Sequence, residues 1–153
     1  MPQPTILFST DFSHASDAAL PHAETLARQQ GARLLIVHVE EPPLAYGGGE
    51  LYYGIPEPDT ARIRAMLEAV KPADPTVPFE QRLAMGDPAV EICRIAADEG
   101  AELIILGTHG RTGLVRLLMG SVAESILRRA PCPVLVYREP GHPATQRPAT
   151  AGV

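Results

Sequence analysis

Five short apolar runs are spaced along the chain, and longer segments with helical periodicity lie between them. Four of the runs are dominated by leucine, isoleucine and valine, whereas the third is weaker and alternates between apolar and polar residues. Continuous runs of this kind are typical of strands buried on both faces, as in a parallel sheet. The predicted strands are Ile6–Phe8, Leu34–Val39, Pro78–Met85, Leu103–Leu106 and Pro133–Tyr137.

Helices are predicted in the four intervals between these strands. In the first interval, Pro21 falls inside an apolar helical stripe, so either that helix begins later than Ser13 suggests or it bends at the proline. The third helix has a clear start at Asp87 and Pro88, because aspartate caps free amides and proline suits the first turn. Gly100 is placed to end it. The second and fourth helices are predicted at about 58–70 and 121–129.

The alternation of strands and helices predicts an α/β fold: a single doubly wound, five-stranded parallel sheet with helices on both faces. In such sheets a ligand binds beyond the carboxyl ends of the strands, where the winding direction reverses. The loops after the first and fourth strands are therefore the candidate site.

Two segments fall outside this alternation. Residues 42–58 are rich in glycine, proline and tyrosine and are long for a strand-to-helix connection, which predicts a mobile loop or lid. Residues 139–153 carry three prolines among small polar residues, which predicts a disordered tail. The folded domain is accordingly expected to cover residues 1–138.

Composition and charge narrow the function classes. A formal net charge of −5 argues against nucleic acid or an anionic membrane as the main partner. Cys93 and Cys132 have no zinc-site or CxxC spacing, and two structural thiols in a reducing compartment are expected. The sequence shows neither a signal-peptide pattern nor an apolar run long enough to span a membrane, so a cytoplasmic protein is expected. The five scattered histidines predict no metal site built by the protein, and His38 is expected to be a satisfied core or strand-end residue.

The strongest local signal is a glycine-rich segment between the fourth strand and the last helix. Gly107-Thr108-His109-Gly110 is followed by nine residues and then by Gly120-Ser121. Glycines allow positive φ and close approach to a ligand, and a helix start offers amides and partial positive charge to a phosphate. The spacing matches neither a Walker A loop nor the Rossmann fingerprint. On spacing alone, a phosphate seat and a flexible loop with a serine cap both stay open.

Residues 4–138 resemble the universal stress protein family. The resemblance rests on the first strand and turn from Ile6 to Ser13, on the second strand, and on the segment from Gly107 to Val136. Family members with the pattern G-x2-G-x9-G-[S/T] tend to bind ATP, and this chain has that pattern intact. The resemblance therefore implies an ATP-binding protein of the stress response.

The resemblance also implies roles for individual residues. Asp11 would contact the ribose or the adenine, and the backbone of Val39 would meet the adenine edge. Arg111 would either add charge to the phosphates or point into solvent. A magnesium or manganese ion would be held through the phosphate oxygens. The complete implied set is Ser9, Thr10, Asp11, Val39, Gly107, His109, Gly110, Arg111, Gly120, Ser121 and Val122.

Three functions are weighed: an ATP-binding sensor or regulatory module, a slow or partner-stimulated ATP hydrolase, and an interaction protein that has lost the nucleotide. The intact glycines disfavour the third. The second lacks a catalytic lysine, and Asp11 is the only acid that can be placed near the loop. The first is therefore preferred, with a downstream protein partner that the sequence does not identify. A homodimer through the fifth strand is also expected, because in the strand order that the resemblance implies this strand lies at an edge of the sheet.

Overall fold

A five-stranded parallel sheet forms the centre of the structure, a computed structural model that describes residues 2–42, 59–108 and 120–138. The strand order is β3-β2-β1-β4-β5, and every pairing is parallel. The winding reverses direction at β1, which confirms the predicted doubly wound sheet. The segments predicted as a lid and as a tail lie outside the described residues, except for Pro42. The strands are β1 (Thr5–Ser9), β2 (Arg33–Glu40), β3 (Phe79–Met85), β4 (Leu103–Gly107) and β5 (Val134–Tyr137).

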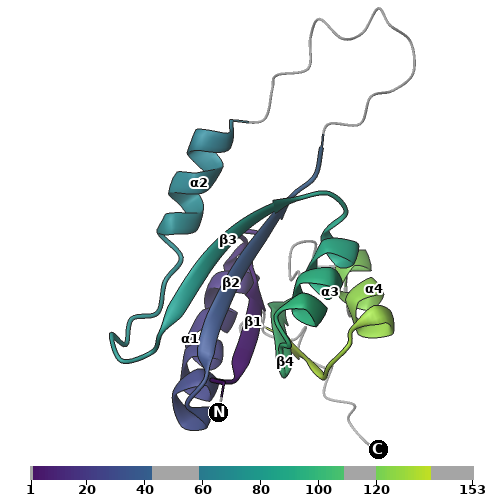
Figure 1. Cartoon of the computed structure of the whole chain (residues 1–153). Coiled ribbons are helices and arrows are strands. Elements are labelled where there is room, and N and C mark those ends of the chain that lie inside the picture. The colour runs from purple at the N-terminus through teal and green to yellow at the C-terminus, as the bar shows by residue number, and fades with distance from the viewer. Residues whose placement is uncertain (1, 43–58, 109–119, 139–153) are drawn as a thin grey trace, which may run out of the picture.

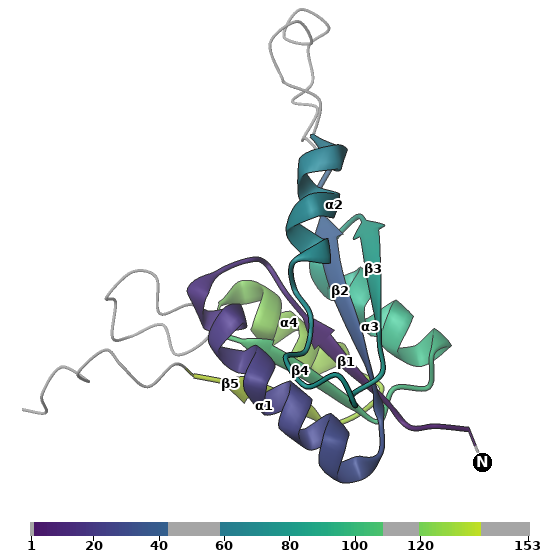
Figure 2. The same cartoon turned by 90° about the vertical axis from the view of Figure 1, so that its left-hand side faces the viewer.

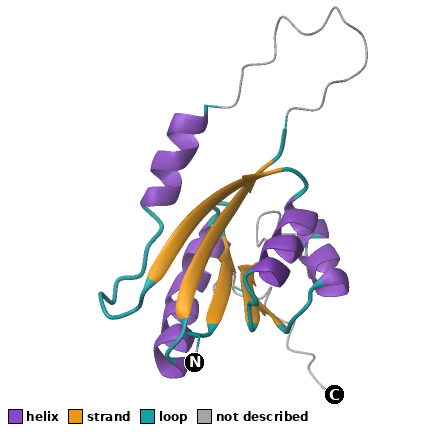
Figure 3. Ribbon diagram, viewed as in Figure 1, coloured by secondary structure: helices purple, strands orange, loops and turns teal. Residues whose placement is uncertain are grey.

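Helices cover both faces of this sheet, as Figures 1 and 3 show. Helix α1 lies on one face, and α3 and α4 lie together on the other (Figure 2). Helix α2 stands beside β3 at the edge of the molecule (Figure 1). None of the helices within the described ranges has the length and apolar character needed to cross a lipid bilayer. Their bounds are α1 (His14–Gln30), α2 (Thr60–Glu68), α3 (Pro88–Asp98) and α4 (Ser121–Arg129).

Helix α1 begins at His14, where the sequence indicates, and it continues through Pro21. The alternative of a later start is therefore wrong. The Ser13 hydroxyl accepts a hydrogen bond from the Ser16 amide at 3.2 Å and caps the first turn. Pro21 lies on the exposed side, while the alanine stripe of the same helix is buried against the sheet. That burial holds the helix together across the amide that proline removes.

The core consists of two apolar layers, one on each side of the sheet. Alternate residues of each strand enter opposite layers, as the pleat requires. The layer under α3 and α4 contains Leu7, Leu35, Val37, Ile92, Ile95, Ile104 and Ile126. The layer under α1 and α2 contains Ile6, Phe8, Ala19, Ala23, Leu34, Ile36, Leu67 and Ile105.

Two partly buried thiols complete the first layer. Cys93 and Cys132 pack against it as free cysteines, in agreement with the structural role expected for them. Burial raises the pKa of both thiols above the ordinary cysteine value. Both side chains are therefore poor nucleophiles near neutral pH.

Helix α2 is fixed to the sheet by one polar side chain. The side-chain amide of Gln81, on β3, donates to the carbonyl oxygens of Leu67 at 3.1 Å and Val70 at 2.8 Å. Leu67 lies in the last turn of α2 and Val70 lies two residues beyond its end, where helical hydrogen-bond partners run out. Leu67 is also the buried apolar residue of this helix.

A closed ring of four charges lies at the amino ends of β2 and β3. Arg33 contacts Glu80 at 3.0 Å and Glu99 at 2.6 Å, and Arg82 contacts the same two carboxylates at 2.7 and 2.8 Å. Hydrogen bonds from Arg82 and then from Arg33 lower the pKa of Glu99. A group with a lowered folded-state pKa stabilises the fold above its unfolded-state pKa, and that stability is lost as the pH falls through the folded-state value.

We predict that Glu99→Gln destabilises the protein near neutral pH and that the difference from the parent shrinks as the pH falls. Urea unfolding of both proteins from about pH 7 to about pH 3 measures this. Asp98→Asn is the matched control, because Asp98 lies beside Glu99 and pairs with the exposed Arg94 outside the ring. An exposed pair of that kind contributes about 0.5 kcal/mol or less. Equal effects of the two substitutions at neutral pH would contradict a special role for the ring.

Candidate functional site

A cleft of about 470 Å³ opens at the carboxyl ends of β2, β1 and β4. It lies where the strand order reverses, which is the position that the doubly wound topology predicts. Helices α3 and α4 both direct their first residues toward it. Its lining consists of Ser9, Thr10, Asp11, Ser16, His38, Val39, Glu40, Glu41, Pro88, Leu106, Gly107, Thr108, Gly120, Ser121, Val122 and Ala123.

Most of the residues that the sequence nominated lie together in this cleft. They come from three separate parts of the chain: the end of β1, the end of β2, and the segment that leads into α4. His109, Gly110 and Arg111 lie outside the described residues. The eight nominated residues that line the cleft are Ser9, Thr10, Asp11, Val39, Gly107, Gly120, Ser121 and Val122.

The loop after β1 is held in shape by its own short polar side chains. The Asp11 carboxylate accepts from the Ser13 amide at 2.9 Å and from the Ser16 hydroxyl at 3.2 Å. The Thr10 hydroxyl accepts from the Phe12 amide at 3.0 Å. Such side-chain-to-backbone bonds replace the partners that a loop backbone lacks. Asp11 is therefore placed at the cleft by a local network that also starts α1.

His38 and Glu40 form the β2 side of the cleft. The His38 side chain is largely buried, with Nδ1 at 2.8 Å from the Thr10 carbonyl oxygen and Nε2 at 3.2 Å from the Glu40 carboxylate. Phe12 covers one side of the imidazole, with ring centroids 4.3 Å apart. The sequence-based view of His38 as a satisfied strand-end residue is confirmed, but the residue also lines the cleft.

The helix starts differ in how their amides are satisfied. Ser13, Asp59 and Asp87 each accept a hydrogen bond from the amide three residues ahead, at 3.0 to 3.2 Å. Helix α4 instead has Gly120 at the capping position and no side-chain cap. Among the described helices, α4 alone leaves its first amides without such a cap, and it does so at the cleft.

This arrangement corrects one interpretation of Ser121. The hypothesis that Ser121 caps the last helix is wrong, because Ser121 is the first helical residue and Gly120 occupies the capping position. Ser121 is exposed and lines the cleft. The other interpretation, a contact with phosphate, stays a prediction.

The two described glycines of the motif serve purposes other than positive φ. Gly120 has φ −69°, an extended conformation open to any residue, so the expectation of positive φ is wrong here. Gly107 is required by packing: a Cβ at this position would lie 2.5 Å from the backbone of Ala15 and 2.8 Å from the Ser16 nitrogen. The end of β4 and the first turn of α1 thus touch backbone to backbone.

Charge is distributed unevenly around the cleft. Asp11, Glu40 and Glu41 place carboxylates at its β1 and β2 side. The uncapped start of α4 places partial positive charge at the opposite side, beyond β4. The described part of the lining includes neither lysine nor arginine. Across the described residues, no three His, Cys, Asp or Glu side chains are grouped to hold a metal ion.

Several lining residues were missed by sequence reasoning. Glu40 ends β2 and Glu41 follows it directly, so the rule that sites form at carboxyl ends of strands could have found them. The role of Pro88 as the first residue of a helix accounts for it in the sequence, so nothing there indicates that it lines the cleft. Ser16 and Thr108 are buried hydroxyl residues. Thr108 occupies a variable position of the glycine-rich motif, whereas Ser16 belongs to no motif and reaches the cleft only through the folded contacts of α1.

Comparison with known proteins assigns the family. The model of the universal stress protein family matches residues 4–138. Universal stress protein MJ0577 of Methanocaldococcus jannaschii is 30% identical over 151 residues, which cover 87% of this chain and 93% of the relative. A universal stress protein of Thermus aquaticus is 36% identical over 138 residues, which cover 88% and 98%. The chain belongs to the universal stress protein family.

Solved structures agree with the fold. The structure of MJ0577 superimposes with a TM-score of 0.67 at 28% identity and covers 90% of this chain and 97% of its own. A universal stress protein in complex with cAMP gives 0.68 at 24% identity, covering 89% and 97%. One from Archaeoglobus fulgidus in complex with dAMP gives 0.62 at 22% identity, covering 89% and 98%. At these last two identities the likeness shows the fold, and the ligands are those of the two proteins.

We predict that Gly107→Ala destabilises the protein by about 1–3 kcal/mol, because the added methyl group meets the α1 backbone and one of the two elements must shift. Urea unfolding measures the loss. Gly120→Ala is the matched control, since its backbone conformation suits alanine. If both substitutions cost the same small amount, the contact between β4 and α1 is looser than described.

Proposed function

We propose that this protein binds ATP in the cleft and acts in the cytoplasm as a sensor or regulatory module of a stress response. The observation that carries the proposal is the start of α4, where amides without a side-chain cap face a cleft of about 470 Å³. Helix starts attract phosphate because their free amides and the helix dipole act together. A cleft of this volume falls within the range of small-molecule sites.

The charges of the cleft fix the orientation of the nucleotide in this proposal. The phosphates lie at Gly120 and Ser121, where the helix supplies donors and partial positive charge. The nucleoside lies toward β1 and β2, because carboxylates accept hydrogen bonds from ribose hydroxyls and from an amino group but repel phosphate. Asp11 follows β1, the central strand of the three whose ends form the cleft.

Sequence and relatives support an adenine nucleotide. The pattern G-x2-G-x9-G-[S/T], which resembles that of ATP-binding family members, is intact from Gly107 to Ser121. Structures with the same fold were solved with cAMP and with dAMP, both of which contain adenine. The triphosphate and the stress-response role are the finer parts of the proposal.

A magnesium or manganese ion fits the proposal as part of the nucleotide complex. The cleft offers hydroxyl and carboxylate oxygens from Ser9, Asp11 and Ser121, the ligand type that hard cations prefer. Magnesium retains waters and is commonly held through substrate phosphates. The ion would therefore bind with ATP, neutralising charge on the phosphates.

Sensing is favoured over rapid hydrolysis. Phosphoryl transfer needs charge stabilisation and a residue that orients the attacking water. The Asp11 carboxylate accepts hydrogen bonds from Ser13 and Ser16, which gives it a structural task in the loop. In the described lining, neither lysine nor arginine is present to stabilise a transferred phosphoryl group.

We predict that Mg-ATP raises the melting temperature of the parent protein by several degrees. At a ligand concentration about a hundredfold above the dissociation constant, the gain is about 2.7 kcal/mol, and each kcal/mol is worth about 2–4 °C at this size. Gly120→Asp and Gly120→Asn test the location. Each side chain would cap α4 and stabilise it by roughly a few tenths of a kcal/mol, while taking the amides from the phosphate.

The two variants separate competition from repulsion. Asparagine should weaken ATP binding, and aspartate, which adds negative charge, should weaken it by a further factor of about ten or more. Gly120→Ala, which adds a methyl group without a cap, is the control. Affinities measured by calorimetry that are equal in all four proteins would place the phosphates elsewhere. A parent melting temperature that millimolar Mg-ATP does not move would defeat the proposed function itself.

A homodimer through β5 is the second part of the proposal. β5 lies at one end of the described sheet, and its residues are half-buried. The carbonyls of Pro133 and Tyr137 accept from Ile104 and Thr108 of β4. Because successive residues of a strand point their backbone groups to opposite sides, Val134 and Val136 direct theirs to the open edge, where a second copy can pair antiparallel about a two-fold axis.

We predict that Val136→Pro converts a dimer into a monomer while the β4–β5 pairing survives, because proline removes an outward amide. Light scattering at micromolar concentration with Mg-ATP distinguishes twice the chain mass from the 16.4 kDa of one chain. Val136→Ala keeps the amide and should remain dimeric. A parent protein of single-chain mass, or a proline variant that stays dimeric, would contradict an interface at this edge.

A further inference from the structure

His38 lies beneath the loop that presents Asp11, and it contacts that loop at two points. The residue is 9% exposed and comes from β2, whereas the loop follows β1. One contact is the 2.8 Å approach of Nδ1 to the Thr10 carbonyl oxygen, and the other is the Phe12 ring. The two contacts fall on the residues immediately before and after Asp11.

The loop has a backbone conformation that needs support. Phe12 has φ +63°, and it is the one described residue other than glycine with positive φ. A bulky side chain at positive φ carries strain of about 1–3 kcal/mol, which persists only where the surroundings hold it. The Phe12 amide donates to the Thr10 hydroxyl at 3.0 Å, and its ring packs on His38. The strained residue is thus held on its backbone by Thr10 and on its side chain by His38.

The hydrogen positions on His38 follow from its partners. A carbonyl oxygen only accepts, so Nδ1 must carry the hydrogen that is shared with Thr10. The Thr10 amide in turn donates to the Val37 carbonyl at 2.9 Å. Both backbone groups of Thr10 are therefore tied to β2, one through Val37 and one through the imidazole.

We propose that His38 is a positioning residue of the nucleotide cleft. It acts through its Nδ1–H bond to Thr10 and its contact with Phe12, which together keep Asp11 oriented toward the ligand before the ligand arrives. A group held in place beforehand costs less ordering entropy on binding. This inference rests on the proposed ATP site, because it gives His38 a task in that site.

Glu40 has the lesser part in this arrangement. Its carboxylate lies 3.2 Å from Nε2, on the side of the imidazole that faces away from the Thr10 carbonyl. A glutamine at position 40 offers Nε2 both an amide NH2 donor and an amide oxygen acceptor, so it can replace the carboxylate as a partner. Glu40→Gln is therefore expected to leave the loop in place, with loop exchange rates close to those of the parent.

Two substitutions at position 38 separate the two ring nitrogens. Asparagine places its amide nitrogen near the position of Nδ1 and can still donate to Thr10, whereas the longer glutamine reaches toward the position of Nε2. Both remove the ring that covers Phe12, so they share that loss. Any difference between them reports the Nδ1 bond.

The expected results concern both the loop and the ligand. In His38→Gln the amides of Phe12 and Ser13, which donate to Thr10 and Asp11, should exchange hydrogen about tenfold faster than in the parent. The dissociation constant of Mg-ATP should rise about tenfold. In His38→Asn both quantities should stay within about threefold of the parent values. Amide exchange by NMR and calorimetry of the full chain give the two readouts.

His22→Gln provides the matched control. His22 is exposed on α1, stacks on Tyr137 with centroids 4.3 Å apart, and is absent from the cleft lining. The same chemical change there should move neither the loop amides nor the affinity. Comparing melting temperatures of all variants shows whether a change in affinity merely follows a change in stability.

The outcomes distinguish failure of this inference from failure of the proposed function. If the parent does not bind Mg-ATP, the function fails, while loop exchange still decides whether His38 holds the loop. If His38→Gln keeps parental exchange at both amides, the positioning role is overturned. If the asparagine and glutamine variants lose affinity equally and in step with their melting temperatures, the ring serves packing alone and the role is likewise overturned.

Discussion

The backbone contact between the end of β4 and the first turn of α1 is the constraint on which the site depends. At Gly107 the two elements are so close that even a methyl group would collide with Ala15. This closeness brings the Ser16 hydroxyl, which belongs to α1, into a cleft otherwise formed by strand ends and by the starts of α3 and α4. Ser16 then binds Asp11, so the strand end, the helix and the loop form one unit.

Around this unit the two sides of the cleft differ in charge and in how the helix starts are capped. Three of the described helices satisfy an early amide with a serine or aspartate side chain, and only α4, in the described chain, begins at a glycine. Partial positive charge therefore remains at one side of the cleft, while the carboxylates of Glu40 and Glu41 stand at the other. A bipolar ligand is suited to that field, and a nucleotide has the required polarity.

The sequence predicted the fold well because its strand signal is unusually direct. Runs such as Leu34–Val39 can be buried only between two layers of helices, and the bounds of α4 follow from Ser121 and Pro131. Pro21 made the start of α1 ambiguous, because proline disfavours the interior of a helix. The burial of the alanine stripe maintains the helix through that position.

The sequence predicted where the candidate site lies, but not the contacts and backbone conformations that shape it. The motif predicts glycines with positive φ. Gly107 is instead required by its close contact with α1, which lies far away in the sequence, and Gly120 leaves the start of α4 without a capping side chain. Positive φ occurs instead at Phe12, a residue for which no sequence rule suggests it. Contacts between β1 and β2 placed His38 in the cleft, and such contacts depend on register that one sequence does not display.

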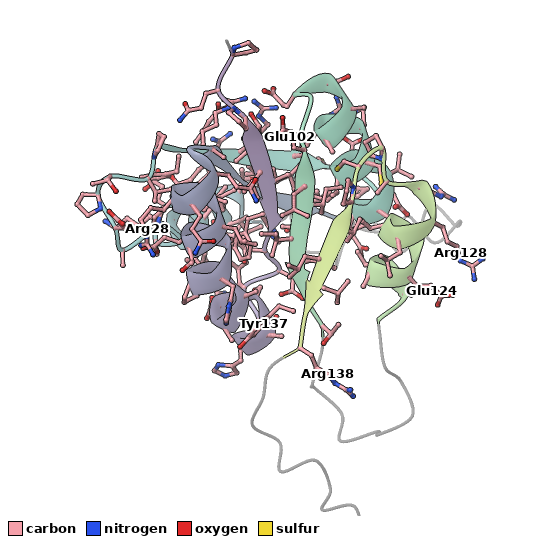
Figure 4. The ribbon with its side chains drawn as sticks, turned by 90° about the horizontal axis from the view of Figure 1, so that it is seen from below. Arg28, Glu102, Glu124, Arg128, Tyr137 and Arg138 are labelled. Atoms are coloured by element: carbon pink, nitrogen blue, oxygen red, sulfur yellow. The ribbon has the colours of Figure 1, made fainter. Side chains whose placement is uncertain are left out.

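The ring of four charges includes the first residue of β2, and the cleft lies at the other end of that strand. Arg33 begins β2 and Glu40 ends it, so the two residues are seven steps apart along the strand, or about 23 Å at about 3.3 Å per residue. Figure 4 shows the two ends of the neighbouring strands, with Glu102 near the start of β4 and Tyr137 at the far end of β5. At such a distance the free energies of substitutions are additive. Substitutions in the cleft can therefore change which ligands it favours without weakening the ion pairs near the start of β2. Proteins that share this scaffold can thus differ in the ligands they bind.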